Sequence, residues 1–376
     1  MWQEVKLSEI GSFSKGAGII KDELTESGAG AVRYGELYTK HNFKIKKIYS
    51  RIPNSIIPIT RKIKYGDILF AGSGETIDEI GKSAAYLLEE ECYAGGDVII
   101  FSPKKADSLF LSYFLNVGEG RKKLRELGQG QSVVHIYKRD IENIKLHLPL
   151  LPEQKRIVAV LETWDQTIEK LTKKIKIKKN IKKGLMQNLL TGKIRLAGFN
   201  EKWETFEVGE LLDYEQPTKY IVKSTEYNEL HKTPVLTANK GFILGYTNEA
   251  EGIYMDTPVI IFDDFTMDNK YVDFNFKIKS SAIKILKQKN DKVNLRFVFE
   301  KMQLFNIVIG QHKRNYISEY QFLTMDMPSI KEQDAITNII VTADKEIKSL
   351  EKRLTILKSQ KKYLLNNLIT GQIRIQ

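Results

Sequence analysis

Two short segments of this 376-residue sequence combine glycine with amide and basic side chains. The first contains Gln129, Gln131, His135, Lys138 and Arg139. The second contains Gln311, His312, Lys313, Arg314 and Asn315. Gln, Asn and Arg can hydrogen-bond to base edges, and Lys and Arg pair with phosphates. We therefore expect both segments to contact nucleic acid, with an ordinary polar surface as the alternative.

The charge of the whole chain favours the same kind of partner. The net charge is +12, which suggests a polyanion, nucleic acid first and an anionic membrane second, although charge alone is weak evidence. Five more polar or basic residues are weaker candidates for DNA contact: Lys15, Arg33, Lys82, Asn239 and Lys240.

A glycine-rich stretch follows a predicted strand at residues 66–70. Phe70-Ala71-Gly72-Ser73-Gly74 resembles the glycine loop of an S-adenosylmethionine site. No Asn-Pro-Pro-Tyr or Asp-Pro-Pro-Tyr tetrad accompanies it anywhere in the chain. We therefore favour a turn, near DNA, over a cofactor site.

Four acidic residues could form a nuclease site: Asp263, Asp264, Asp268 and Asp273. The Lys277 and Lys279 that come after them do not complete a Glu-x-Lys or Asp-x-Lys motif, so a solvated or capping role is the better interpretation. The chain also lacks a Walker loop and a nucleophile triad. We predict no catalytic residue, no metal site and no cofactor bound by this chain.

The candidate residues are positioned by a long internal repeat. Residues 149–196 and 328–375 align without a gap at an offset of 179. Glu153-Gln154 falls on Glu332-Gln333. Thr-Gly-x-Ile-Arg ends both copies, at 191–195 and 370–374. A long fixed period of this kind indicates a duplicated architecture.

Both copies are predicted to be long helices with a coiled-coil seam. In the second copy, apolar residues recur in steps of four and three from Ile336 to Leu368, interrupted only at Lys361. In the first, the series from Ile157 slips at Lys178 and resumes at Ile181. The many lysines of residues 170–183 could contact phosphate, but we favour the solvated face of an amphipathic helix.

Two blocks of mixed strands and helices separate the repeats. We predict globular domains at 1–150 and 197–328, and helices at 151–196 and 329–376. Trp203 opens the second block as Trp2 opens the first, and we expect the two ends of the chain to meet. The single Cys92, the lack of a signal peptide and the lack of a long apolar run predict a cytoplasmic chain without disulfides or membrane spans.

The chain resembles the specificity subunits of type I restriction–modification systems. The resemblance covers the whole chain and rests on the paired Pro-x-x-x-Glu-Gln helices, their Thr-Gly-x-Ile-Arg ends, Gly66-Asp67-Ile68-Leu69, and the stretch from Phe262-Asp263-Asp264-Phe265-Thr266 to Ser280-Ser281. It implies two target-recognition domains, each reading one half of a split site in double-stranded DNA. It also implies that two methylation subunits dock on the helices and that restriction subunits can join. S-adenosylmethionine, and ATP with Mg²⁺, would then belong to those partners.

The expected fold class is α+β, with two mixed α/β domains separated by two long antiparallel coiled-coil helices in a pseudo-two-fold arrangement. We expect Ile157 to lie near Leu368, because antiparallel packing brings opposite ends together. Two other functions stay open. A single-chain methyltransferase or nuclease lacks a catalytic constellation, and a coiled-coil scaffold or membrane binder leaves two divergent domains unexplained.

Overall fold

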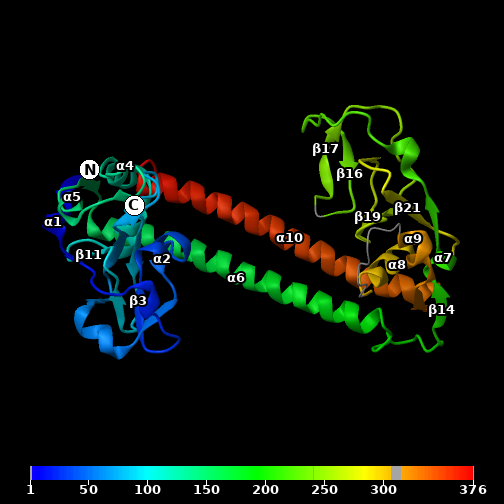
Figure 1. Cartoon of the computed structure of the whole chain (residues 1–376), viewed down its shortest axis with the longest axis horizontal. Coiled ribbons are helices and arrows are strands. Elements are labelled where there is room, and N and C mark those ends of the chain that lie inside the picture. The colour runs from blue at the N-terminus through cyan, green and yellow to red at the C-terminus, as the bar shows by residue number, and fades with distance from the viewer. Residues whose placement is uncertain (1, 240, 306–314, 376) are drawn as a thin grey trace. The chain divides into compact units, whose positions relative to one another are not determined.

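The computed structural model describes residues 2–239, 241–305 and 315–375. The chain divides into two compact units. Unit 1 is Met1–Thr172 with Arg353–Gln376, and unit 2 is Lys173–Lys352. Each unit contains one globular domain, called the first or second domain below, and a stretch of both long helices (Figure 1).

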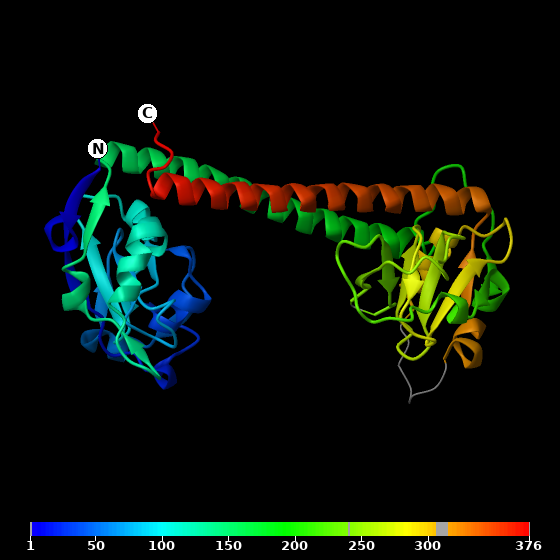
Figure 2. The same cartoon turned by 90° about the horizontal axis from the view of Figure 1, so that it is seen from above.

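The two long helices are α6 (Leu151–Leu189) and α10 (Ile330–Ile369). In unit 1, Ile157 near the start of α6 shares a buried core with Leu368 near the end of α10. In unit 2, Leu189 near the end of α6 shares a core with Ile336 near the start of α10. Low-numbered residues of one helix thus meet high-numbered residues of the other, which confirms antiparallel packing within each unit (Figure 2).

The seam of α6 does not slip at Lys178, so that prediction is wrong. Ile181 is 50% exposed. The four-and-three series continues instead through Lys178 and Lys182, whose ammonium groups lie 2.9 Å from Glu346 and 2.7 Å from Asp344 of α10. A lysine can occupy a seam position here because its charge meets a carboxylate on the facing helix.

The same polar contact occurs in unit 1. Lys361 of α10 lies 2.7 Å from Asp165 of α6 and is half-buried. Lys361 and Lys182 are 179 residues apart, as are Asp344 and Asp165. The residue that interrupts the apolar stripe in α10 is therefore half of a duplicated ion pair.

The Glu-Gln pair at the start of each helix has two structural tasks. Glu153 accepts hydrogen bonds from Arg374 at 2.5 and 2.7 Å, and Glu332 accepts two from Arg195 at 2.7 Å. Each Glu thus holds the end of the other long helix. These bonds explain why both copies carry Glu at one end and Ile-Arg at the other.

Gln154 and Gln333 tie the helices to the domains. The side-chain oxygen of Gln154 accepts the backbone N–H of Asp107, the N-cap of α3 (Ser108–Asn116), at 2.9 Å. That of Gln333 accepts the N–H of Asn294, the N-cap of α8 (Leu295–Met302), at 2.8 Å. Each Gln therefore fixes the start of a domain helix against the start of a long helix.

The tryptophan at the head of each block packs on the end of a long helix. The guanidinium of Arg374 lies 6.0 Å from the Trp2 ring centroid, and that of Arg195 lies 5.4 Å from Trp203. Trp2 and Arg374 thus lie together in unit 1, as expected for the two ends of the chain.

The first domain contains a five-stranded sheet in the order β2-β11-β7-β9-β4, all antiparallel except β9 with β4. Its strands are Gly11–Lys15, Val98–Pro103, Ile68–Ala71, Ser83–Tyr86 and Phe43–Ile45. A four-stranded sheet has the order β5-β3-β10-β6, at Ser50–Ile52, Ala29–Val32, Cys92–Ala94 and Arg61–Ile63.

The remaining elements of the first domain are short. β1 (Gln3–Lys6) pairs with β13 (Lys145–Leu148), and β8 (Ser73–Gly74) pairs with β12 (Val134–His135). The helices besides α3 are α1, α2, α4 and α5, at Leu7–Ile10, Tyr34–Thr39, Gly118–Glu126 and Lys138–Ile141. Two 3-10 turns lie at Lys21–Glu23 and Asn54–Ile59.

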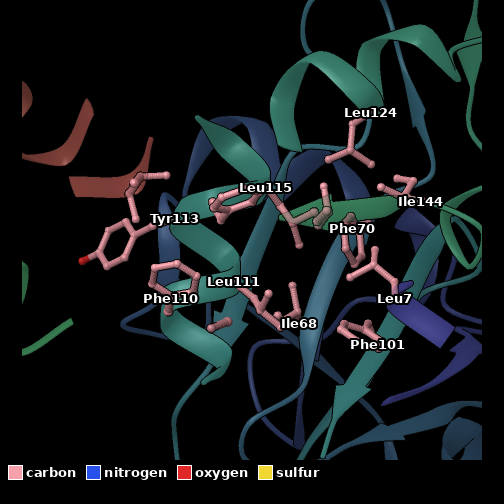
Figure 3. Close-up of a cluster of buried hydrophobic side chains, with 14 of the residues drawn as sticks. Leu7, Ile68, Phe70, Phe101, Phe110, Leu111, Tyr113, Leu115, Leu124 and Ile144 are labelled. Carbon is pink, nitrogen blue, oxygen red and sulfur yellow. The ribbon is translucent and has the colours of Figure 1, made fainter. Parts of the chain in front are cut away.

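Apolar side chains cover both faces of the five-stranded sheet. Ile68 and Phe70 of β7 point into a core that includes α3 and α4 (Figure 3), while Leu69 and Ala71 belong to a second core. Successive side chains of a strand face opposite sides, so a strand buried on both faces is apolar throughout. This explains the uninterrupted apolar run that made β7 recognisable in the sequence.

The second domain has a four-stranded antiparallel sheet in the order β15-β21-β18-β19, at Leu212–Glu215, Ile283–Gln288, Val259–Asp263 and Asn269–Val272. A three-stranded sheet has the order β17-β16-β20, at Ile243–Thr247, Thr233–Leu236 and Lys277–Ile278. β14 (Glu204–Glu207) pairs with β22 (Thr324–Met327). The short helices are α7, α9, η3 and η4, at Val208–Leu211, Asn315–Ser318, Pro217–Tyr220 and Tyr320–Phe322.

The two domains repeat one plan despite their faint sequence similarity. The N–H of Leu7 in α1 donates to the carbonyl of Ile144 at 3.0 Å, and that of Val208 in α7 donates to Leu323 at 2.9 Å. In both, the strands around β7 or β18 pair antiparallel with their neighbours. The expected fold class is confirmed: each unit joins a mixed α/β domain to antiparallel segments of two long helices.

Candidate nucleic-acid interface

A surface hollow of about 660 Å³ in the first domain gathers four of the predicted residues: Lys15, His135, Lys138 and Arg139. Lys15 ends β2, His135 ends β12, and the other two begin α5. Gly72, Ser73 and Asp97 also line it. Residues far apart in sequence thus form one polar surface, as base and phosphate contact would require.

An aromatic ring lies between two of these residues. The rings of His135 and Tyr137 stack with centroids 6.4 Å apart, and the Arg139 guanidinium lies 5.5 Å from the Tyr137 centroid. Tyr137 is 45% exposed. Tyr137 is not among the residues predicted from the sequence, although the alternation of basic and aromatic residues from 135 to 139 points to it. Aromatic rings and Arg side chains can stack on bases or reach their edges.

His135 is held in place from the neighbouring strand. Its Nδ1 lies 2.9 Å from Oγ of Ser73, and β8 pairs directly with β12. The backbone N–H of Ile136 donates to the carbonyl of Gly72 at 2.9 Å. The His135–Tyr137 stack therefore stands on a hydrogen-bonded support rather than on a free loop.

Lys138 and Arg139 form only exposed ion pairs with neighbouring carboxylates. Lys138 lies 3.2 Å from Glu142, and Arg139 lies 3.7 Å from Asp140. Arg139 is 79% exposed as a side chain. Ion pairs so exposed to water are weak, so a phosphate could replace the carboxylate at little cost.

The other predicted residues of the first domain do not line this hollow. Gln129 and Gln131 are exposed, and Gln129 exchanges two backbone hydrogen bonds with His135, at 2.9 and 2.7 Å. Arg33 lines a second hollow, which shares Asp97 with the first. Lys82 lines neither hollow, and its ammonium donates to the carbonyl of Tyr38 at 3.4 Å.

In the second domain, most of the predicted residues lie outside the described part of the chain. These are Lys240, Gln311, His312, Lys313 and Arg314. Asn239 is described, and its side-chain oxygen accepts a hydrogen bond from Oγ1 of Thr266 at 3.1 Å. Asn315 is only 3% exposed, and its side-chain amide donates to the carbonyl of Phe265 at 3.3 Å. Asn315 therefore supports a turn rather than facing solvent.

The acidic residues of the second domain have structural partners. Oδ1 of Asp263 accepts the backbone N–H groups of Phe265 and Thr266 at 3.0 and 2.9 Å, which is the expected capping role. Asp264 is buried beside Lys284 at 3.3 Å rather than solvated. Among the described residues, no three His, Cys, Asp or Glu side chains are grouped to hold a metal ion.

The glycine-rich stretch after β7 serves close packing. A Cβ atom on Gly72 would lie 2.8 Å from the carbonyl oxygen of Asp97, which is closer than real contacts allow. Its own N–H donates to that oxygen at 2.8 Å. Glycine is therefore needed here for the approach of two backbones, which accounts for the residue without a ligand.

Fold and surface together define a protein with two α/β domains built on one plan and a basic surface hollow in the first domain. The family described as "Type I restriction modification DNA specificity domain" matches residues 1–179. The Escherichia coli EcoR124I/EcoR124II specificity subunit is 40% identical over 187 residues, 46% of this chain and 46% of that protein. The MjaVIII specificity subunit of Methanocaldococcus jannaschii is 25% identical over 427 residues, covering 100% of this chain and 93% of that protein.

A solved structure shares the fold over nearly the whole chain. The crystal structure of a type I restriction–modification S subunit from M. genitalium has a TM-score of 0.62 at 16% identity, covering 98% of this chain and 96% of that one. This chain is thus similar to type I restriction–modification specificity subunits in the sequence of its first half, and to a solved S subunit in fold. Within the described residues, no helix is long and apolar enough to cross a membrane.

Proposed function

We propose that each domain reads one half of a bipartite site in double-stranded DNA. The observation that supports this most directly is the shared plan of the two domains combined with different side chains at equivalent surface positions. Two domains with one frame can meet DNA in similar ways, while unlike surfaces select unlike bases. In the first domain, the hollow around Lys15, His135, Tyr137, Lys138 and Arg139 makes the contact, and Gln129, Gln131 and Arg33 are further candidates outside this hollow.

In the second domain, we place the contact at the turn around Thr266, with Asn239 beside it. The candidates Lys240 and Gln311, His312, Lys313 and Arg314 stay predictions for the same half-site. Asn315 is left out because its amide is already bonded inside the turn. We also leave out Lys82, whose ammonium is bonded within the domain.

The paired helices set the separation of the half-sites and carry the partner subunits in this proposal. Two methylation subunits dock on them, and restriction subunits can join the complex. Duplicated helix contacts support two equivalent docking places, since Lys182–Asp344 and Lys361–Asp165 repeat one geometry. The chain acts in the cytoplasm, where its DNA target lies.

We further propose that the chain is not itself catalytic. S-adenosylmethionine, and ATP with Mg²⁺, would bind to the partner subunits. The capped Asp263 and the buried Asp264 support this, because neither carboxylate is presented for metal chemistry.

The test is to co-express the chain with its methylation subunit and map methylated sites across a genome. We expect one bipartite motif, and replacing residues 1–150 with the domain of another specificity subunit should change one half of the motif only. A continuous motif, or a change in both halves, would contradict the proposal. Methylation by the purified chain alone would contradict the non-catalytic role.

A further inference from the structure

Phe265 presents an aromatic ring at the turn between β18 and β19. Its side chain is 42% exposed. Single exposed apolar side chains are common in proteins, so exposure alone assigns no role. The informative feature is how firmly the backbone beneath this ring is held.

Three hydrogen bonds fix the turn at Phe265 and its neighbour. Oδ1 of Asp263 accepts the N–H groups of Phe265 at 3.0 Å and Thr266 at 2.9 Å, and the amide of Asn315 donates to the Phe265 carbonyl at 3.3 Å. Met267 completes the turn with a φ of 58°, a left-handed conformation uncommon for a non-glycine residue. The ring is therefore carried on a backbone with little freedom.

A buried ion pair holds the turn from below. Asp264 and Lys284 are separated by 3.3 Å, and their side chains are 3% and 2% exposed. The other carboxylate oxygen of Asp264 accepts the N–H of Tyr316 at 2.9 Å. The Tyr214 ring centroid lies 5.0 Å from the Lys284 ammonium. A buried charge pair fixes geometry because separating its partners leaves an uncompensated charge.

An equivalent backbone hydrogen bond lies beside the hollow of the first domain. There the Gly72 carbonyl accepts the N–H of Ile136 at 2.9 Å, and here the Asp264 carbonyl accepts the N–H of Asn315 at 2.9 Å. Phe265 thus occupies the place of Ser73, whose hydroxyl touches His135. The equivalent position therefore belongs to the proposed DNA-contacting surface of the first domain.

We propose that Phe265 contacts the C5-methyl group of a thymine in the half-site read by the second domain. This inference rests on the proposed function. A phenyl ring offers no hydrogen bond to a base edge, and the thymine methyl is the apolar group displayed in the major groove. A ring held on a fixed turn can favour thymine at one position because other bases present no methyl there.

The test compares wild type, Phe265→Ala and Phe265→Leu in complex with the methylation subunit. In competition binding with duplexes varied in one half-site, Phe265→Ala should reduce the preference for thymine at one base pair by about tenfold. The other half-site should be read as before. Phe265→Leu should keep part of the preference, because leucine still offers an apolar contact.

Replacing that thymine with uracil removes only the methyl group. Wild type should lose about tenfold in affinity for the uracil duplex, and Phe265→Ala should bind both duplexes equally. Phe322→Ala is the matched control, since Phe322 is 57% exposed in the same domain but lies in η4, outside the turn. It should behave as wild type.

An unchanged base preference in folded Phe265→Ala, or wild-type binding that ignores uracil, would overturn the inference and leave the proposed function intact. Wild type without any preferred DNA site would instead overturn the proposed function, and this inference with it. Thermal unfolding and assembly with the methylation subunit establish that each variant is folded.

Discussion

The two domains use one hydrogen-bonded frame to display different chemistry. In the first domain, the turn at Gly72 supports His135, with the Tyr137 ring and Arg139 beside it. In the second, the same backbone contact supports a turn that carries Phe265. The first turn is tight because Gly72 lets two backbones meet, and the second is tight because Asp264 is paired with Lys284. Duplication thus preserved the support while the displayed side chains diverged.

The largest expected effect comes from breaking the support of the second turn. Asp264→Ala leaves Lys284 buried without its partner, so we expect a loss of about 3–5 kcal/mol in unfolding free energy. Chemical denaturation followed by hydrogen exchange would measure the loss and locate it in the second domain. Asp264→Asn is the matched variant, because it keeps an acceptor for the N–H of Tyr316 but removes the charge. Wild-type stability in Asp264→Ala would show that the pair does not hold the turn.

The next comparison concerns the two Glu–Arg contacts at the helix ends. Glu332 is 1% exposed as a side chain and also accepts a hydrogen bond from the Trp203 ring nitrogen at 3.2 Å, whereas Glu153 is 9% exposed. The ring nitrogen of Trp2 is buried and has no hydrogen-bond partner among the residues that the structure describes. We therefore expect Arg195→Ala to lower protection from hydrogen exchange in unit 2 more than Arg374→Ala lowers it in unit 1. Equal losses would show that the deeper burial of Glu332 adds nothing to the cost of removing its arginine.

A smaller effect is expected from the exposed arginine of the first domain. Arg139→Ala should cost about 1–3 kcal/mol in binding to the cognate half-site if Arg139 contacts a base, with fold stability unchanged. Competition binding with single-base variants would distinguish base contact from phosphate contact, which weakens all sequences alike. Lys155→Ala, an exposed basic residue on α6, serves as the control. Equal weakening at both half-sites would contradict assignment to one domain.

The smallest expected effect comes from Lys301, which packs against the tryptophan at the head of the second block. Trp2 packs against Phe114, whereas Trp203 packs against the ammonium of Lys301 at 4.9 Å. Burial lowers the pKa of Lys301 to about 8. Since the unfolded chain binds this proton more tightly, the contribution of Lys301 to stability rises as pH increases from 8 to about 10.5.

Lys301→Met should remove this pH dependence. The variant should gain melting temperature relative to wild type at pH 7, and the gain should shrink by pH 9.5. Thermal unfolding at both values checks this. A difference between the proteins that does not change with pH would show that Lys301 does not titrate in this window.

The sequence was most informative where both copies of the repeat carry the same residue. Glu153, Gln154 and their counterparts marked the two helices as copies, and the seams predicted that the helices pair. The antiparallel orientation was implied by the resemblance to the specificity subunits. The position of Ile181 could not be predicted from apolar periodicity, because the carboxylates that favour Lys178 and Lys182 in the seam lie on the other helix.

Residues at the proposed DNA surface were harder to predict. Asn315 looked like a base reader because polar type and neighbours suggested it, yet its amide completes a turn formed by a segment 50 residues away. Phe265 and Tyr137 were missed because exposed aromatic residues resemble core residues in a sequence. Only the tertiary frame shows which side chains the turns present.

The most direct test that the two domains read different half-sites uses Arg139→Ala and Phe265→Ala. Each is tested on duplexes in which one half-site at a time is randomised. Each variant complex with the methylation subunit is compared with wild type for selectivity at the intact half. We expect Arg139→Ala to lose selectivity only for the half-site of the first domain, and Phe265→Ala only for that of the second. Loss by both variants at the same half-site would contradict it.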